Sequence, residues 1–67
     1  MTRHDYVRIA DRATASILSS TDDAPTGGYI LDVIDLVSGG ELDFTQMGIV
    51  FDMVQARIKA RQHHDVA

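Results

Sequence analysis

Residues 42–62, Leu-Asp-Phe-Thr-Gln-Met-Gly-Ile-Val-Phe-Asp-Met-Val-Gln-Ala-Arg-Ile-Lys-Ala-Arg-Gln, carry the longest uninterrupted helical pattern in the chain. The pattern begins at a complete start signal, because Asp43 can cap the free amides of the first turn and Gln46 can bind the Asp43 amide in return. No proline interrupts the run, and the acidic start and basic end both suit the helix dipole. We predict a helix over about residues 44–62.

The apolar residues of this helix fall on two opposite sides. The first stripe, with Phe44 at its edge, should face the core and consists of Met47, Val50, Phe51, Val54 and Ile58. The second stripe consists of Ile49, Met53, Ala56 and Ala60. Two interpretations of the second stripe stay open. In one, the helix is sandwiched between two helices of the same chain; in the other, the stripe contacts another chain, either a second copy or a target.

Residues 3–19 show a second amphipathic pattern, which starts directly after Thr2. Thr2 and Asp5, three residues later, form an imperfect capping box. Its inward stripe consists of Tyr6, Ile9, Ala10, Ala13 and Ile17. Residues 19–28 then gather most of the turn formers and include the only proline. We therefore predict a helix over about residues 3–19 and a loop after it.

Residues 29–38 are apolar enough to suit a buried strand, so their polar positions decide the assignment. These positions recur every three residues, at Asp32, Asp35 and Ser38. Strand side chains alternate with a period of two, so this spacing favours a helix. Gly39 and Gly40 follow as a helix stop. We predict a short helix over about residues 29–38, with a strand as the alternative because of its β-branched residues.

Together these segments predict a single all-α domain, residues 1–67, built from three helices. The expected core consists of Tyr6, Ile9, Ile17, Ile30, Val33, Ile34, Val37, Val50, Phe51, Val54 and Ile58. A chain this short buries only about 60% of its unfolded surface, and it has no cysteine for a disulfide or a thiolate metal site. Oligomerisation is the remaining reinforcement, so we expect a homodimer through the third helix.

The net charge of −4 is unevenly distributed along the chain. All six Lys and Arg lie in residues 3–12 or 57–61, whereas residues 13–56 hold seven acids and no base. Such an acidic block repels phosphate and suits either a solvated face or a basic surface on a protein partner. The candidate partner-binding residues are Ile49, Met53 and Ala56 on the second stripe, with Asp32, Asp35 and Asp52 from the acidic block.

No residue pattern indicates catalysis, so we do not expect an enzyme, a cofactor or a metal site. The histidines lie near the ends, at positions 4, 63 and 64, where a rigid site is hard to build. Asp32 and Asp35 share a helix face, but this spacing alone is more typical of a solvated face. The chain contains neither a signal-peptide core nor 18 consecutive apolar residues, so we expect a soluble, cytoplasmic protein that does not enter a membrane.

The opening residues, Met-Thr-Arg-His-Asp-Tyr-Val-Arg-Ile-Ala, with a late helix start at Asp43 and Phe44, resemble small uncharacterised helical proteins encoded by bacteriophages and prophages. The resemblance covers mainly residues 1–10. It implies a phage accessory protein that acts inside a bacterial cell by binding a host or phage protein. It implies no active site.

Two functions remain open on these observations. The first is a small acidic interaction module that regulates or inhibits a protein partner, for example a bacterial defence nuclease. The second is a dimeric DNA-binding regulator whose basic ends come together in a positive strip, formed by Arg3, Arg8, Arg12, Arg57, Lys59 and Arg61. We expect the first, because the acidic block makes nucleic acid an unfavourable partner.

Overall fold

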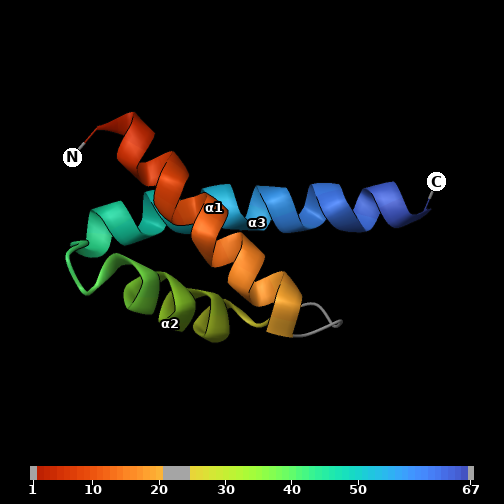
Figure 1. Ribbon diagram of the computed structural model, residues 1–67, viewed down its shortest axis with the longest axis horizontal. Helices are drawn as coiled ribbons and strands as arrows, with labels where there is room; N and C mark the ends of the chain where they lie inside the picture. Colours follow the sequence, from red (N-terminus) through yellow and green to blue (C-terminus); the bar gives the residue numbers. More distant parts are fainter. Residues whose placement is uncertain (1, 21–24, 67) are drawn as a thin grey trace.

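The computed structural model describes residues 2–20 and 25–66 of the chain, with side chains up to Arg61. Its elements are the helices α1 (Arg3–Ser20), α2 (Gly27–Ser38) and α3 (Phe44–Val66), and no strand occurs in these residues. This confirms the all-α, three-helix prediction and excludes the strand alternative for residues 29–38. α1 crosses α3, and α2 lies beside α3 and runs back along it (Figure 1). Residues 21–24, which belong to the predicted loop, lie outside the described part.

Local side-chain contacts set the starts of the helices. The Asp43 amide donates to Gln46 Oε1 at 2.9 Å, and the Gln46 amide donates to Asp43 Oδ1 at 2.8 Å, which confirms the capping box of α3. At α1 the Thr2 amide donates to Asp5 Oδ2 at 2.9 Å, and the Asp5 amide donates to the Thr2 hydroxyl at 3.4 Å. Asp5 therefore closes the α1 box in place of the usual glutamate or glutamine.

α2 starts earlier than the sequence pattern indicated, because Thr26 caps it. The Tyr29 amide donates to the Thr26 hydroxyl at 3.2 Å, so the two glycines expected in the loop form the first turn of the helix. α2 ends as predicted, where the amides of Gly39 and Gly40 donate to carbonyls of the last turn at 3.3 and 3.1 Å. Gly39 has a φ of 69°, the left-handed conformation of a helix-terminating glycine.

The other helix ends extend beyond their predicted limits. α1 continues to Ser20 and α3 to Val66, whereas we predicted ends near residues 19 and 62. Neither glycine nor proline follows residue 62, so no residue stops the helix there. Figure 1 shows that this last part of α3 extends past both α1 and α2.

The core lies where the three helices meet and contains mostly the residues that the periodicity predicted. Its buried members are Ala10, Ala13, Ile17, Ile30, Val33, Ile34, Val50, Val54 and Ile58. The rest of the predicted core is half-buried and packs against it, namely Tyr6, Ile9, Val37 and Phe51. Polar contacts join α1 to α3 around this core, and Gln46 Nε2 donates to the Tyr6 hydroxyl at 3.2 Å. Gln46 thus both caps α3 and contacts α1.

Candidate protein-interaction surfaces

An open groove of about 300 Å³ lies between α2 and the first turns of α3. We call it the α2–α3 groove, and it is lined by Leu31, Phe44, Met47, Gly48 and Phe51. The Phe51 ring lies near the start of α2, because a Cβ added to Gly27 would lie 3.6 Å from Phe51 Cζ. A Cβ added to Gly48 would have no neighbour within 4 Å, so the groove is open at that position. All of the lining residues except glycine are large and apolar.

Phe44 is the most exposed large apolar residue in this groove, with 96% of its surface accessible. We placed it at the edge of the core stripe, and the structure puts it outside the core. The reason is its position, because Phe44 is the first residue of α3 and helical side chains point toward the N-terminus of their helix. Leu31 is also 40% exposed. The groove therefore leaves two large apolar side chains in contact with solvent.

The candidate acids Asp32, Asp35 and Asp52 are exposed on the two helices that form the groove. Asp35 lies one turn after Leu31 on α2, and Asp52 lies one turn after Gly48 on α3. Within the described residues the only ion pair joins Arg57 to Asp11, so these carboxylates have no basic partner there. Asp35 and Asp52 therefore lie next to the apolar groove, and Asp32 lies about 100° farther around α2 from Leu31.

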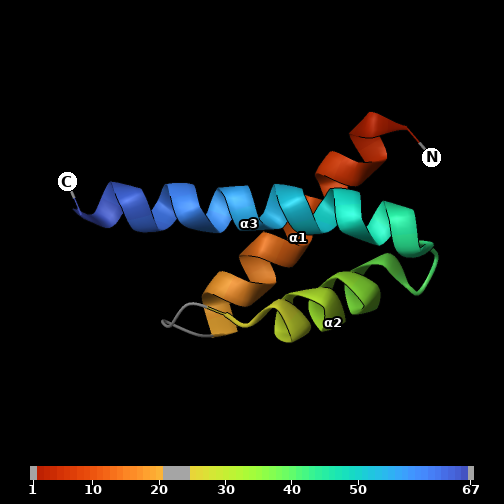
Figure 2. The same ribbon diagram turned by 180° about the vertical axis from the view of Figure 1, so that it is seen from behind.

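The second stripe of α3 is accessible to solvent. Ile49 is 38% exposed, Ala56 and Ala60 are also exposed, and Met53 is half-buried against the core. Figure 2 views α3 from the side that neither α1 nor α2 covers. The second stripe is therefore not enclosed between two helices of its own chain, although Met53 packs against the core. Met53 and Ala56 instead line an open groove beside α1.

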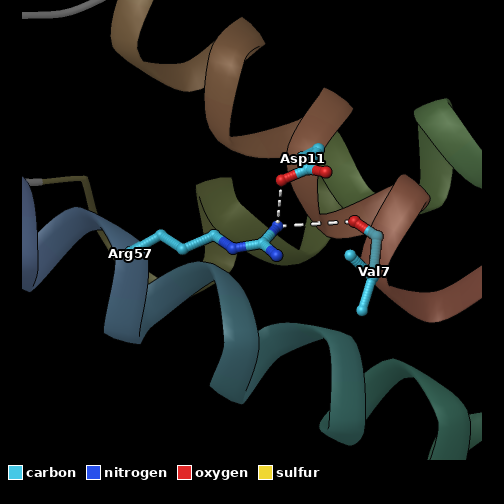
Figure 3. Close-up of polar contacts among 3 residues, drawn as sticks. All are labelled: Val7, Asp11 and Arg57. Atoms are coloured by element: carbon cyan, nitrogen blue, oxygen red, sulfur yellow. Dashed lines mark hydrogen bonds and ion pairs between the residues drawn. The ribbon is translucent and has the colours of Figure 1, made fainter. Parts of the chain in front are cut away.

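The basic residues at the chain ends do not gather into one strip within a single chain. Arg57 Nη1 is 2.7 Å from Asp11 Oδ1 and donates to the Val7 carbonyl at 3.4 Å, so this arginine ties α3 to α1 (Figure 3). Arg8 and Arg12 line a separate groove together with two acids, Asp5 and Glu41. DNA binding by the combined basic ends would require a dimer, and it stays a prediction.

The candidate acid, base and metal-ligand side chains of the described residues include Asp5 and His4. Hydrogen bonds from the Thr2 amide and hydroxyl lower the pKa of the Asp5 carboxyl below its ordinary value. His4 is exposed, while the side chains of residues 63 and 64 lie outside the description. Among the described residues no group of three or more His, Cys, Asp or Glu is placed to hold a metal ion. No helix in this part of the chain has the length and apolar character needed to cross a membrane.

No protein-family model, no curated protein and no solved structure matches this chain. The resemblance to phage-encoded helical proteins therefore stays a prediction. The arguments for function depend on the geometry of the surfaces described above.

The structure separates the six candidate partner-binding residues into two surfaces and adds residues that the pattern did not indicate. Asp35 and Asp52 each lie one turn from a residue that lines the α2–α3 groove, and Asp32 lies about 100° around α2 from Leu31, whereas Ile49, Met53 and Ala56 lie on the second stripe. Leu31, Phe44 and Gly48 were missed as site residues. A signal was present, because Leu31 lies off the inward stripe of its helix and Gly48 interrupts a run of good helix formers.

Proposed function

We propose that this chain is a small acidic protein-interaction module that regulates or inhibits a protein partner inside a bacterial cell. The observation that carries the proposal is the 96% exposure of Phe44 beside Leu31, on a surface with unpaired carboxylates. Exposed large apolar residues rimmed by polar groups are typical of protein-binding surfaces. The described residues form this surface, and no group of three or more His, Cys, Asp or Glu among them is placed to hold a metal ion.

The charge of this surface supports a basic partner. Complementary charge speeds association and disfavours wrong partners, and an acidic surface competes with phosphate for the same basic site. A protein that normally binds nucleic acid, such as a defence nuclease, is therefore a suitable target. Binding at its nucleic-acid site would inhibit it without any chemistry by this chain.

Affinity capture from a bacterial lysate tests this proposal. The wild type is compared with Asp32→Asn/Asp35→Asn, and the control Ala15→Lys/Ser16→Lys makes the same change in net charge at exposed positions of α1. We expect the wild type and the control to retain a basic partner that the Asn variant loses and that elutes as salt rises. The partner's nucleic-acid binding should fall when the wild type is added. Equal capture by all three proteins, or no capture, would contradict the proposal.

We further propose that two copies pair through the second stripe of α3, in antiparallel orientation. The residues Ile49, Met53, Ala56 and Ala60 follow the 4-3-4 spacing of a coiled-coil seam. In an antiparallel pair the two alanines of each copy face the larger Ile49 and Met53 of the other. Asp52 and Lys59 lie on one flank of the stripe, seven residues apart, so each Asp52 approaches the other copy's Lys59.

Charge reversal tests this pairing, with sedimentation equilibrium as the measurement. Asp52→Lys and Lys59→Asp each place like charges together at both ends of the seam and should weaken association by roughly tenfold. The double variant restores both pairs and should associate as the wild type does. The pairing is wrong if the wild type stays monomeric at millimolar concentration, or if the double variant is weaker than either single one.

A further inference from the structure

We propose that the α2–α3 groove is a docking site for an amphipathic α-helix of another protein, with large apolar side chains on one face and Lys or Arg beside them. This inference rests on the proposed function and adds the place on the chain and the chemistry of the occupant. Four features carry it, namely the shape of the groove, its lack of backbone partners, its charge and the arrangement of the chain's own basic segments.

The shape of the groove suits large apolar side chains from a partner. Phe44, at 96% exposure, and Leu31, at 40%, come from different helices and line the groove together. Phe51 and Met47 are half-buried against the core and provide the apolar floor. Because Gly48 has no side chain, a partner can approach the α3 backbone closely at this position. The volume of about 300 Å³ can accept a few apolar side chains.

The backbone of the groove favours a helical occupant over an extended one. Extended peptides bind by adding a strand to a sheet edge, but the described residues contain no strand, and backbone groups inside the helices bond within each helix. The lining side chains are apolar and cannot bond a peptide backbone either. An occupant that loses water here must therefore satisfy its own amides and carbonyls, as a helix does.

The charge beside the groove favours a basic occupant. α2 and the first three turns of α3 contain exposed Asp32, Asp35 and Asp52 and no Lys or Arg. Lysine or arginine next to the apolar face of the partner helix would neutralise these carboxylates while its leucine-like residues enter the groove. An acidic amphipathic helix would bring like charges together and should be rejected.

A second copy of this chain does not have the required pattern. Its basic residues lie in residues 3–12 and 57–61. Tyr6, Ile9 and Ile58 of these segments pack in or against the chain's own core, and Val7 is half-buried. Ile49 is an exposed apolar residue of α3, but its neighbour Asp52 is acidic. The occupant that fits is therefore a helix from a different protein.

Fluorescence anisotropy with a designed peptide tests the proposal. The probe is a fluorescein-labelled 18-residue peptide with Leu at helical spacings of three and four and Lys at the other positions. A scrambled peptide of the same composition and a version with Glu in place of every Lys are the controls. We expect the Leu/Lys peptide to bind the full chain in a salt-dependent manner, and to bind at least about tenfold more tightly than either control.

Variants then locate the binding. Phe44→Ala removes an exposed ring, and Gly48→Leu adds a side chain at an exposed position where a Cβ meets no atom within 4 Å, so both should fold. Each should weaken peptide binding about tenfold or more. Leu36→Ala is the matched control, because Leu36 is 81% exposed but lies about 140° around α2 from Leu31. It should bind as the wild type does.

Three results would overturn the proposal. They are equal binding of the scrambled or Glu peptide, equal effects of Phe44→Ala and Leu36→Ala, and self-association of the wild type that Phe44→Ala abolishes. The last result would assign the groove to a second copy. Failure of the docking-site proposal is distinguishable from failure of the proposed function. If lysate capture requires Asp32 and Asp35 but not Phe44, the proposed function stands and the docking site does not.

Discussion

The Thr14 hydroxyl is a buried polar group without a partner. The residue is 8% exposed, and its Oγ1 atom has no hydrogen-bond partner among the described residues. Replacing the hydroxyl by a methyl group in Thr14→Val removes this desolvation cost, while the helix propensities of the two residues are similar. We predict that the variant raises the free energy of unfolding by about 1 kcal/mol. Urea denaturation measures the change, with Thr14→Ser as the comparison that keeps the hydroxyl and loses a methyl group.

The Asp5 carboxylate makes the start of α1 sensitive to acid. Its hydrogen bonds from Thr2 lower the folded pKa below the ordinary value of 3.8. A lowered folded pKa means that the cap stabilises the chain above pH 3.8 and that this contribution is lost as pH falls through the folded pKa. We predict that the difference in unfolding free energy between wild type and Asp5→Asn shrinks below pH 3.8. A difference that stays constant from pH 7 to acid would contradict it.

Individual residues were predictable where their contacts are local. Asp43 and Gln46 bind each other within one turn, so the sequence spacing alone indicated the box. The exposure of Phe44 was not predictable in this way. Its position at the start of α3 was predicted, but whether α1 or α2 covers that turn depends on how the helices pack.

At the scale of the helices, two glycines with empty surroundings should have opposite effects when changed to alanine. Neither a Cβ at Gly39 nor one at Gly48 would meet an atom within 4 Å, so sterics do not distinguish them. Gly39 has a φ of 69°, whereas Gly48 lies inside α3 without a positive φ. We predict that Gly39→Ala destabilises the chain by about 1 kcal/mol and that Gly48→Ala stabilises it by about 1 kcal/mol. Thermal denaturation of the two variants checks both signs.

The helices themselves were largely predictable, and their ends were less so. Periodicity identified α2 correctly, because Ile30, Val33 and Ile34 are buried while Asp32 and Asp35 are exposed. The start of α2 was wrong by a short segment because glycines next to Thr26 also fit a loop. A capping hydroxyl decides between these conformations only when the following backbone is helical.

At the scale of the whole molecule, the last turns of α3 should be dispensable for folding. Ile58 is the last buried residue among the side chains that the structure describes, and α3 continues beyond it past the other helices. We predict that removing residues 63–67 leaves the unfolding midpoint near that of the wild type. Ile58→Ala is the contrast and should cost about 2–5 kcal/mol. Circular dichroism of both variants during urea denaturation tests the pair, and a loss of cooperative unfolding in the truncated chain would contradict the prediction.

The candidate surfaces could be predicted only in part, because they depend on how the helices pack. The sequence showed that the second stripe of α3 was apolar and that Asp32, Asp35 and Asp52 belonged to an acidic block. It did not show that one side of α3 is left uncovered by both α1 and α2, or that Ile49 is exposed. The α2–α3 groove is lined by residues of two helices, so its shape depends on how α2 packs against α3.

The hydrogen bond between Tyr6 and Gln46 also bears on the rate at which this chain reaches its native state. The two residues are 40 positions apart, so the contact closes most of the chain into a loop. The entropy lost on closing such a loop costs about 3 kcal/mol plus a constant. Helical contacts within each element are local, and bundles rich in them fold within microseconds to milliseconds. The crossing of the first and last helices is therefore the slow event to expect, and prior docking of the middle helix would shorten the segment still to be closed.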